Sequence, residues 1–276
     1  MAAKSKRGPA SAPAQPRTVR VLSLGAGVQS STLLLMAVHG EIQIDRAIFA
    51  DTQWEPKEVY DWLGGLELAA GAVGIPVDTV TAGSLREDSL HKKGWILSVP
   101  AFIQKADGSA GVVNRTCTNG YKIRPIYRRL RELGATAKQP VDLLMGISLD
   151  EVQRMKPARV KYVNNLFPLI DRRMSRQACL SWMEQHGYPQ PPKSACIGCP
   201  FRNDRSWRRM KDTAPDDWAD AVKFDQQVRH VGQMKTPTEA YLHRSLVPLP
   251  MVDLSTQQDA GQLDLFDAEC EGMCGV

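Results

Sequence analysis

The feature that most constrains this fold is a regular alternation of short β-branched segments with helical segments, which begins at residue 18. Segments in this order form βαβ units, in which neighbouring strands run parallel and the connecting helices cover both faces of the sheet. The sequence therefore predicts an α/β fold with a Rossmann-like, doubly wound and mostly parallel sheet. Its strands are expected at residues 18–24, 45–50, 75–81, 141–147 and 165–170.

The same patterns divide the chain into four parts. Residues 1–17 are rich in Ala, Pro, Ser and Lys without apolar periodicity, which predicts a disordered basic arm. Residues 18–174 form the α/β domain. Residues 175–235 are expected to form a C-terminal helical extension that contains a Cys-x-x-Cys motif and packs on that domain. Residues 236–276 have little periodicity and are expected to form a tail. Helices are expected at residues 31–39, 121–133, 175–186, 203–211 and 216–231.

Composition limits the class of protein and its compartment. No apolar run of the 276 residues reaches the roughly 18 residues of a membrane span, and the N-terminus lacks the apolar stretch of a secretory signal. These observations predict a cytoplasmic protein without membrane contact. The net charge of +5 is compatible with an anionic substrate, and six cysteines are few for a disulfide scaffold of this size.

A loop of small residues follows the first predicted strand. Residues 23–32 are Ser-Leu-Gly-Ala-Gly-Val-Gln-Ser-Ser-Thr. At the carboxyl end of a parallel strand, small residues let the backbone approach a phosphate, which the amides of the next helix bind. The loop is not a Walker A motif, because it has no Gly-Lys-Ser/Thr, and Ser30 stands at the third glycine position of a GxGxxG motif. An ordinary tight turn is the alternative.

This loop resembles that of the PP-loop adenine-nucleotide superfamily, which is approximately Ser-Gly-Gly-x-Asp-Ser. Four later segments resemble the sulfonucleotide (PAPS and APS) reductase branch, and the whole resemblance runs from about residue 18 to residue 200. The segments are residues 51–58 (DTQWEPKE), Cys117 with residues 122–126 (KIRPI), residues 146–154 (GISLDEVQR) and residues 167–171 (FPLID). Each motif is weak alone, whereas five in the same order are specific.

The resemblance implies an adenine-nucleotide site at the carboxyl ends of the strands. Its implied nucleotide-binding residues are Ser23, Gly25, Ala26, Gly27, Gln29, Ser30, Ser31, Asp51, Thr52 and Gly146, and its implied sulfate- or phosphate-binding residues are Lys122, Arg124 and Arg154. Gln29 stands where ATP-cleaving members have an acidic residue beside magnesium pyrophosphate. ATP cleavage is therefore disfavoured, and magnesium binding stays open. Asp51 has an alternative role as the N-cap of the helix that begins near Pro56.

Three cysteines are candidate metal ligands. Cys196 and Cys199 form a Cys-x-x-Cys turn, whose two thiolates can share one metal ion or cluster. With Cys117 they resemble the set that binds a [4Fe–4S] cluster in APS reductases, although one cysteine of that set is missing here. Structural zinc with a tail cysteine or His186 is one alternative, and unligated thiols are another. Cys179 lies in an amphipathic stretch and is expected in the core.

The C-terminal tail carries Cys270 and Cys274. Sulfonucleotide reductases have a C-terminal Glu-Cys-Gly whose thiolate attacks the sulfur of the bound nucleotide, and residues 269–272 (ECEG) resemble it with one insertion. Either cysteine is thus a candidate nucleophile, with a thiol reductant such as thioredoxin as its partner. A fourth metal ligand and an idle tail are the alternatives. Residues 262–266 (QLDLF) match the peptide that docks on the DNA sliding clamp, although an apolar contact with the protein's own body is favoured.

Two helical faces rich in arginine follow the predicted site residues. The first consists of Arg124, Arg128 and Arg131, and the second consists of Arg202, Arg205 and Arg209. Beside an adenine-nucleotide site, such faces can hold the sulfate or 3′-phosphate of PAPS, or a nucleic-acid backbone. A solvated face is the alternative.

Three functional hypotheses follow. The first is a PAPS/APS reductase-like oxidoreductase that binds an adenine sulfonucleotide and uses thiol or iron–sulfur chemistry. The second is an ATP-dependent sulfur-insertion enzyme that modifies DNA or tRNA, which the arginine faces and the three-cysteine set favour and Gln29 opposes. The third is a non-catalytic nucleotide-binding partner in a larger assembly.

Overall fold

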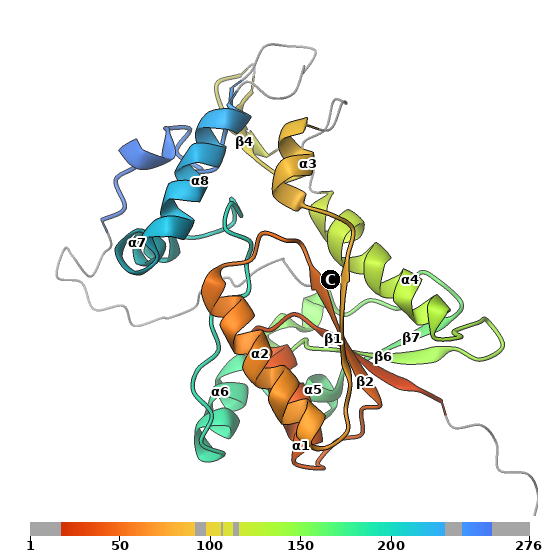
Figure 1. The fold of residues 1–276 in the computed structure, drawn as a ribbon. Coiled ribbons are helices and arrows are strands. Elements are labelled where there is room, and N and C mark those ends of the chain that lie inside the picture. The colour runs from red at the N-terminus through yellow and green to blue at the C-terminus, as the bar shows by residue number, and fades with distance from the viewer. Residues whose placement is uncertain (1–17, 92–97, 106, 113–115, 230–238, 256–276) are drawn as a thin grey trace, which may run out of the picture.

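Five parallel strands form the central sheet of the computed structural model, which describes residues 18–91, 98–105, 107–112, 116–229 and 239–255 (Figure 1). The strand order is β3-β2-β1-β6-β7, and every neighbouring pair is parallel. The strands are β1 (Arg20–Leu24), β2 (Arg46–Asp51), β3 (Val77–Thr81), β6 (Val141–Met145) and β7 (Val163–Leu166).

Helices cover both faces of this sheet, as its apolar strands require. One face packs against α1 (Val28–Val38), α2 (Lys57–Ala72), α5 (Pro168–Asp171) and α6 (Arg176–Gln185). The other face packs against α4 (Arg124–Glu132), whose Ile126 and Leu130 contact the strands. Helix α1 lies between the sheet and its neighbours α2 and α6, which explains why residues on all its sides are buried.

The strand order places a crevice at the carboxyl end of β1. From β1 the chain proceeds in one direction to β2 and β3, and it then crosses back to add β6 and β7 on the other side. Connections therefore leave β1 and β6 toward opposite faces of the sheet. In open α/β sheets, ligands bind in the crevice at this switch point.

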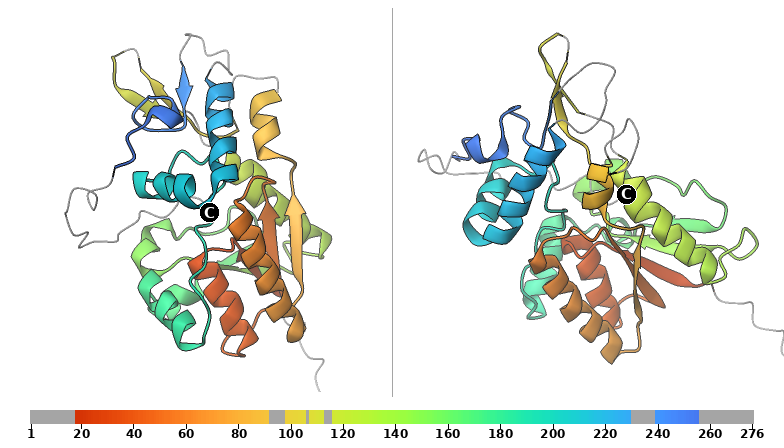
Figure 2. Two further views of the ribbon diagram at one scale, coloured as in Figure 1. Left: turned by 60° about the vertical axis from the view of Figure 1, so that its left-hand side comes forward. Right: turned by 45° about the horizontal axis from the view of Figure 1, so that its top comes forward.

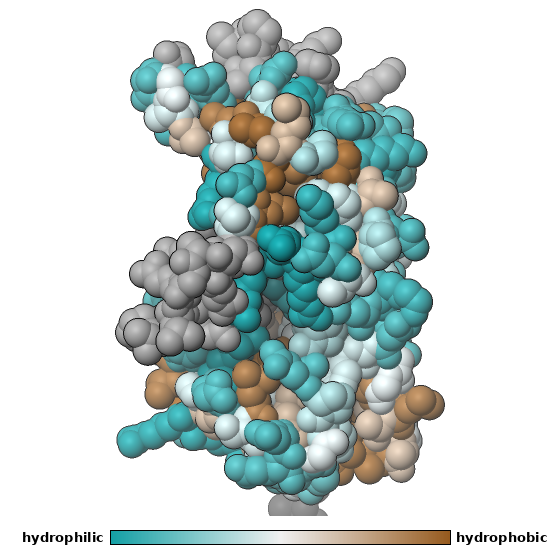
Figure 3. Space-filling model, turned by 90° about the vertical axis from the view of Figure 1, so that its left-hand side faces the viewer, coloured by the Kyte–Doolittle hydropathy of each residue, from teal (hydrophilic) through white to brown (hydrophobic). Residues whose placement is uncertain are grey.

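A second, smaller part of the chain lies beyond the carboxyl edge of the sheet (Figure 2). It contains α3 (Leu85–His91), β4 (Phe102–Gln104), β5 (Ala110–Val112), α7 (Asp204–Thr213), α8 (Pro215–Val228) and β8 (Ala240–Tyr241). The strands β5, β4 and β8 form an antiparallel sheet. Trp207 and Phe224 are fully buried in the hydrophobic core of this smaller part. Seen from the side of α7, hydrophilic residues cover the middle of the molecule and hydrophobic residues gather in its upper part (Figure 3).

Trp54 connects the two parts. It follows β2 by three residues, and its indole ring packs against Phe224 of α8 with the ring centroids 4.4 Å apart. Its indole Nε1 donates a hydrogen bond to Asp220 Oδ2 at 2.7 Å. Trp54 therefore anchors the smaller part over the crevice.

The structure confirms the predicted fold class and corrects two predicted elements. The strand expected at residues 165–170 is wrong, because β7 ends at Leu166 and Pro168 begins the short helix α5. Proline suits a first helical turn and cannot donate to a strand ladder. The helix expected at residues 121–133 is preceded by a wider π-helical turn, Thr118–Ile123, and α4 proper begins at Arg124, next to Pro125.

The segment of residues 236–276, which is expected to form a tail, contains further structure in its described part. Residues 239–255 include β8 and a 3-10 turn, Leu249–Met251. Leu242 and Leu249 are fully buried against α8. Two buried leucines on so short a segment are too few to produce a periodic pattern, and tertiary contacts decide their burial.

Candidate functional site

The loop after β1 has the geometry of an anion-binding turn. Gly27 is the N-cap of α1, and the Gly25 amide donates a hydrogen bond to Ser30 Oγ at 3.1 Å. Ala26 is fully buried with a φ of 55°, in the left-handed region that non-glycine residues rarely adopt. The amides of the first turn of α1 have no partner within the helix, and the positive end of its dipole favours an anion beside them.

A pocket opens at this loop, at the carboxyl ends of β1, β2 and β6. Eight of the residues predicted from sequence line it, namely Ser23, Gly25, Gly27, Gln29, Ser30, Lys122, Gly146 and Arg154. Gly146 is required for the close approach of β6 to the loop, because a Cβ atom there would lie 2.8 Å from the Ser30 amide nitrogen. We call this cavity the nucleotide pocket.

Three other predicted residues do not line the nucleotide pocket. Ala26 is buried within the loop. Ser31 is fully buried in α1, where its Oγ accepts a hydrogen bond from Trp62 Nε1 at 2.9 Å. Arg124 is exposed and lines a neighbouring groove beside α4. The positions of Ser31 and Arg124 follow from the helical rotation of α1 and α4, which the linear motif does not convey.

Asp51 lies at the end of β2 and also does not line the nucleotide pocket. Its Oδ1 accepts hydrogen bonds from the Gln53 amide at 2.7 Å and from Tyr60 OH at 2.8 Å. Burial, followed by the hydrogen bond to Asp51, raises the pKa of Tyr60 well above its usual value. The N-cap of α2 is Pro56. Asp51 therefore stabilises the turn after β2, and it does not cap α2.

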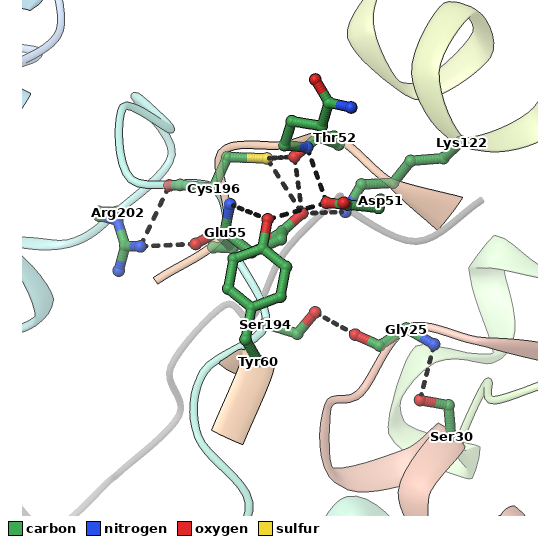
Figure 4. Close-up of polar contacts among 12 residues, drawn as sticks. Gly25, Ser30, Asp51, Thr52, Glu55, Tyr60, Lys122, Ser194, Cys196 and Arg202 are labelled. Carbon is green, nitrogen blue, oxygen red and sulfur yellow. Dashed lines mark hydrogen bonds and ion pairs between the residues drawn. The ribbon is translucent and has the colours of Figure 1, made fainter. Parts of the chain in front are cut away.

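A strap that carries no sequence motif of its own closes one side of the nucleotide pocket. It consists of Lys193, Ser194 and Ala195, directly before the Cys-x-x-Cys turn. Ser194 Oγ donates a hydrogen bond to the Gly25 carbonyl (Figure 4). A Cβ atom on Gly27 would lie 3.3 Å from Ser194 Cβ. In the sequence, these residues are recognisable only as the link between a helix and the cysteine pair. That position does not reveal which residues the strap contacts.

The charges that line the nucleotide pocket suit an anion. Its cations are Lys122, Arg154 and Lys193. Among the described lining residues, Glu151 is the one carboxylate, and it accepts from Arg154 Nη1 at 2.5 Å and from Gln29 Nε2 at 3.2 Å. The Gln29 amide is thus held by Glu151, at the position where an acidic residue would serve a magnesium ion.

The three predicted ligand cysteines line one small apolar cavity next to the nucleotide pocket. Cys117, Cys196 and Cys199 share it with Trp54 and other residues. Gly198 makes this packing possible, because a Cβ atom there would lie 2.1 Å from Trp54 Cη2. The fold therefore brings Cys117 to the Cys-x-x-Cys turn. We call this space the cysteine cavity.

A buried polar cluster joins the cysteine cavity to the nucleotide pocket (Figure 4). Glu55 is 4% exposed, and its Oε1 accepts from Thr52 Oγ1 at 3.1 Å and from Cys196 Sγ at 3.3 Å. The Lys122 ammonium lies 3.5 Å from the same oxygen. Thr52, a predicted nucleotide-binding residue, also contacts Cys196 Sγ at 3.3 Å. Within the described structure Glu55 Oε2 is buried without a hydrogen-bond partner.

Arg202 holds the backbone of the Cys-x-x-Cys turn. Its Nη2 donates to the Ala195 carbonyl at 2.6 Å and to the Cys196 carbonyl at 3.1 Å. The Cys199 amide donates to the same Cys196 carbonyl at 3.1 Å. Arg202 is 8% exposed. A buried guanidinium that binds two carbonyls fixes the backbone on both sides of Cys196.

The described cysteines do not have the geometry of a single-ion site. Four thiolates around zinc, with Zn–S bonds of about 2.3 Å, bring sulfur atoms to roughly 3.8 Å from one another. Within the described residues, no group of three His, Cys, Asp or Glu side chains is close enough to hold one metal ion. Cys117, Cys196 and Cys199 nevertheless line one shared cavity.

Cys179 is a core residue, as the sequence predicts. It is fully buried on the inner side of α6, and burial raises the pKa of its thiol to about 12. Such a thiol stays protonated at neutral pH and is unreactive.

Several predictions lie outside the described residues, namely the arm 1–17, the clamp-like peptide 262–266, and the candidate nucleophiles Cys270 and Cys274. In the described part of the chain, no helix is both long enough and apolar enough to cross a membrane.

No protein-family model and no curated protein matches the chain. Among solved structures it is similar to a phosphoadenylyl-sulfate (PAPS) reductase from Candida auris in a phosphate complex, with a TM-score of 0.42 and 16% identity over 64% of this chain and 76% of that one. It is also similar to the U34-tRNA thiolase NcsA from Methanococcus maripaludis with its [4Fe–4S] cluster, with a TM-score of 0.40 and 14% identity over 78% of this chain and 72% of that one. The order and direction of the five strands confirm the doubly wound α/β fold that the resemblance to PP-loop proteins predicts.

Proposed function

We propose that this protein is an enzyme that binds an adenine sulfonucleotide and reduces it in the manner of PAPS and APS reductases. The observation that carries the proposal is the junction of the two cavities. Lys122 and Thr118 line both the nucleotide pocket and the cysteine cavity. A group bound in the pocket therefore lies beside the cysteines, with the Lys122 ammonium between them.

The residues of the nucleotide pocket have separate tasks in this proposal. The loop at Gly25 and Gly27, with the amides of α1, binds the phosphate next to the ribose. Lys122, Arg154 and Lys193 neutralise the terminal sulfate or a 3′-phosphate. The cations also lower the energy of the negative charge that develops on the departing nucleotide.

The reaction begins with a cysteine thiolate, for which Cys270 and Cys274 are the candidates. The thiolate attacks the sulfur of the bound sulfonucleotide, and an S–S bond forms while the bond between that sulfur and the phosphate oxygen breaks. The adenine nucleotide leaves with the electron pair of the broken bond. A second thiol, from a thioredoxin-like reductant, then attacks the enzyme sulfur and releases sulfite, so that a disulfide remains.

Cys117, Cys196 and Cys199 are proposed as the ligands of a [4Fe–4S] cluster. The support for this proposal is that the three cysteines line one cavity, which at about 20 Å³ must widen to admit a cluster. When bound, a cluster would supply redox capacity beside the sulfate. Arg202 holds the Cys196 carbonyl, and Gly198 leaves room for Trp54, so both keep the ligand turn in place.

A second candidate is ATP-dependent sulfur insertion into DNA or tRNA. The observation that favours it is the basic groove beside α4, which joins the nucleotide pocket. The engagement of Gln29 by Glu151 opposes it, because the described pocket then has no carboxylate left for magnesium.

One panel of assays tests these functions on protein purified without oxygen. Iron and sulfide analysis should show a brown, cluster-containing protein, and a colourless, zinc-loaded protein would refute the cluster. Sulfite release from APS or PAPS with a thiol reductant should be lost in Cys270→Ser or Cys274→Ser and retained in Cys179→Ser. Pyrophosphate release from ATP that depends on nucleic acid would support the second candidate instead. Nucleotide binding without either reaction would indicate a non-catalytic partner.

A further inference from the structure

A wide groove runs beside α4, on the face of the sheet opposite to α1 and α2. Its walls are α4 and the segment of residues 153–162, and its volume is about 1200 Å³. Pockets for small ligands have volumes of roughly 300–1000 Å³. The groove is therefore larger than a free nucleotide requires.

The groove is basic. Five exposed cations line it, namely Arg124, Arg128, Arg131, Lys156 and Arg159. Within the described structure, none of these five side chains has a carboxylate oxygen within 4.0 Å, the distance limit of an ion pair. Glu132 also lines the groove, and it accepts from Arg129 Nη1 at 3.2 Å. Unpaired like charges in one groove repel one another, and a bound polyanion removes that cost.

The arginines of α4 differ in what they contact. Arg129 binds Asp78 Oδ2 at 2.7 Å and thereby ties the helix to β3. Arg124, Arg128 and Arg131 line the groove instead. One arginine of the helix is therefore tied to the sheet, and the other three line the groove.

Two tyrosines lie among these cations. Tyr127 and Tyr162 line the groove, and their ring centroids are 6.1 Å apart. The Arg131 guanidinium lies 5.9 Å from the Tyr162 centroid. Aromatic rings interleaved with arginines bind unpaired bases by stacking while the cations bind the backbone.

The groove opens directly into the nucleotide pocket. Both are lined by Thr118, Ile123, Tyr127, Arg154 and Asn165. We infer that the groove binds a single strand of nucleic acid, with phosphates on its five cations and bases at its tyrosines, and leads one nucleotide toward the pocket. The inference goes beyond the first proposed reaction and rests on the second, for which it names the surface that binds the acceptor strand.

The test uses fluorescence anisotropy of the full chain with labelled oligo-dT and oligo-U of about 20 nucleotides. Both should bind at low salt, with an affinity that falls steeply between about 50 and 200 mM salt. Arg128→Glu/Lys156→Glu should weaken binding about tenfold or more and reduce the salt slope by about one to two. Lys57→Glu/Lys223→Glu, with the same change in net charge on α2 and α8, should leave the affinity within about twofold of wild type.

Equal losses in the two double variants would overturn the inference, as would a wild-type chain that binds neither oligonucleotide at low salt. Tyr162→Ala should weaken binding without changing the salt slope, and Tyr162→Phe should retain it, because stacking needs the ring and not the hydroxyl. Tighter binding of a duplex, or equal competition by polyglutamate, would refute recognition of a single strand.

A separate titration with AMP distinguishes this inference from the proposed chemistry. Arg128→Glu/Lys156→Glu should bind AMP like wild type, because neither residue lines the nucleotide pocket. Strand binding that persists in a chain without any sulfur-transfer activity would support the groove and refute the second function. Loss of AMP binding together with strand binding would show a folding defect and overturn the assignment of these two residues.

Discussion

The Lys122 ammonium lies 3.5 Å from Glu55 Oε1, and the same oxygen accepts hydrogen bonds from Thr52 and Cys196. The Glu55 side chain is 1% exposed and that of Lys122 is 19% exposed. The lysine therefore offsets a buried charge at the junction of the two cavities.

Removing the charge of either Glu55 or Lys122 alone should destabilise the protein more than removing both charges. Lys122→Met leaves the Glu55 carboxylate buried beside thiols, which should lower the free energy of unfolding by about 3–5 kcal/mol. Adding Glu55→Gln to that variant should recover most of the loss, since a neutral amide needs no counter-charge. Urea unfolding of the two single variants and the double variant measures the coupling. Additive effects would contradict a direct interaction.

Glu55→Gln alone should also change ligand binding. Without the carboxylate, Lys122 has one anion fewer to bind and should attract a nucleotide sulfate or phosphate more strongly. The dissociation constants of AMP and PAPS should fall a few-fold at low salt and converge with wild type at high salt. Isothermal titration at two salt concentrations tests this, and weaker binding would mean that Glu55 itself contacts the ligand.

Gly146→Ala should damage the nucleotide pocket. The added Cβ would lie 2.8 Å from the Ser30 amide nitrogen and 3.0 Å from Ser30 Cα, so β6 or the loop must shift. We expect a loss of about 1–3 kcal/mol of stability and of tenfold or more in nucleotide affinity. Gly65→Ala is the matched control. It lies within α2, has no atom within 4 Å of the added Cβ, and should be neutral or stabilising by about 0.5–1 kcal/mol.

Ala26 is expected to tolerate glycine and reject a β-branched residue. Its φ of 55° costs an L-residue roughly 1–2 kcal/mol. Ala26→Gly should relieve this strain, but glycine also raises the conformational entropy of the unfolded chain. The free energy of unfolding should therefore stay within about 1 kcal/mol of wild type. Ala26→Val should lose more than about 2 kcal/mol and bind nucleotide poorly. Thermal melts and AMP titration of the two variants provide the comparison, and equal tolerance would mean that the loop is conformationally free.

Cys179 should make the folded protein sensitive to alkali. Its thiol pKa is raised by burial to about 12, from 9.0 in an exposed thiol. Above pH 9 the unfolded chain releases a proton that the folded chain retains, so stability falls as the pH rises from about 9 toward 12. Cys179→Ala should unfold more easily at pH 7 but show a flatter decline above pH 9. Parallel slopes for the two proteins would contradict a buried, protonated thiol.

Alkylation provides an independent check on the same thiol. At pH 8, iodoacetamide should leave Cys179 unmodified in the folded protein and modify it in urea, because the reagent attacks the accessible thiolate. Mass spectrometry of the tryptic peptide distinguishes the two outcomes.

Much of the candidate site was predictable because it depends on short-range patterns. Gly25 and Gly27 after an apolar strand, and Cys196 with Cys199 in one turn, carry their chemistry in adjacent positions. Their placement at the carboxyl edge of a parallel sheet follows from the βαβ order alone. Asp51 and Thr52 show the limit, since Asp51 ends β2 and Thr52 follows it, yet the structure turns them toward Tyr60 and Cys196.

The sequence by itself determined the α/β class, the place of the glycine loop at the end of the first strand and the burial of Cys179, because periodicity and local spacing encode them. Tertiary structure alone decided that Glu55 meets Lys122, that Ser194 closes over Gly25, and that Arg128 and Lys156 line one groove. These pairs come from separate elements, and their contact depends on how helices and loops pack around the sheet. Packing is set by the summed shape of many side chains, which no local motif contains.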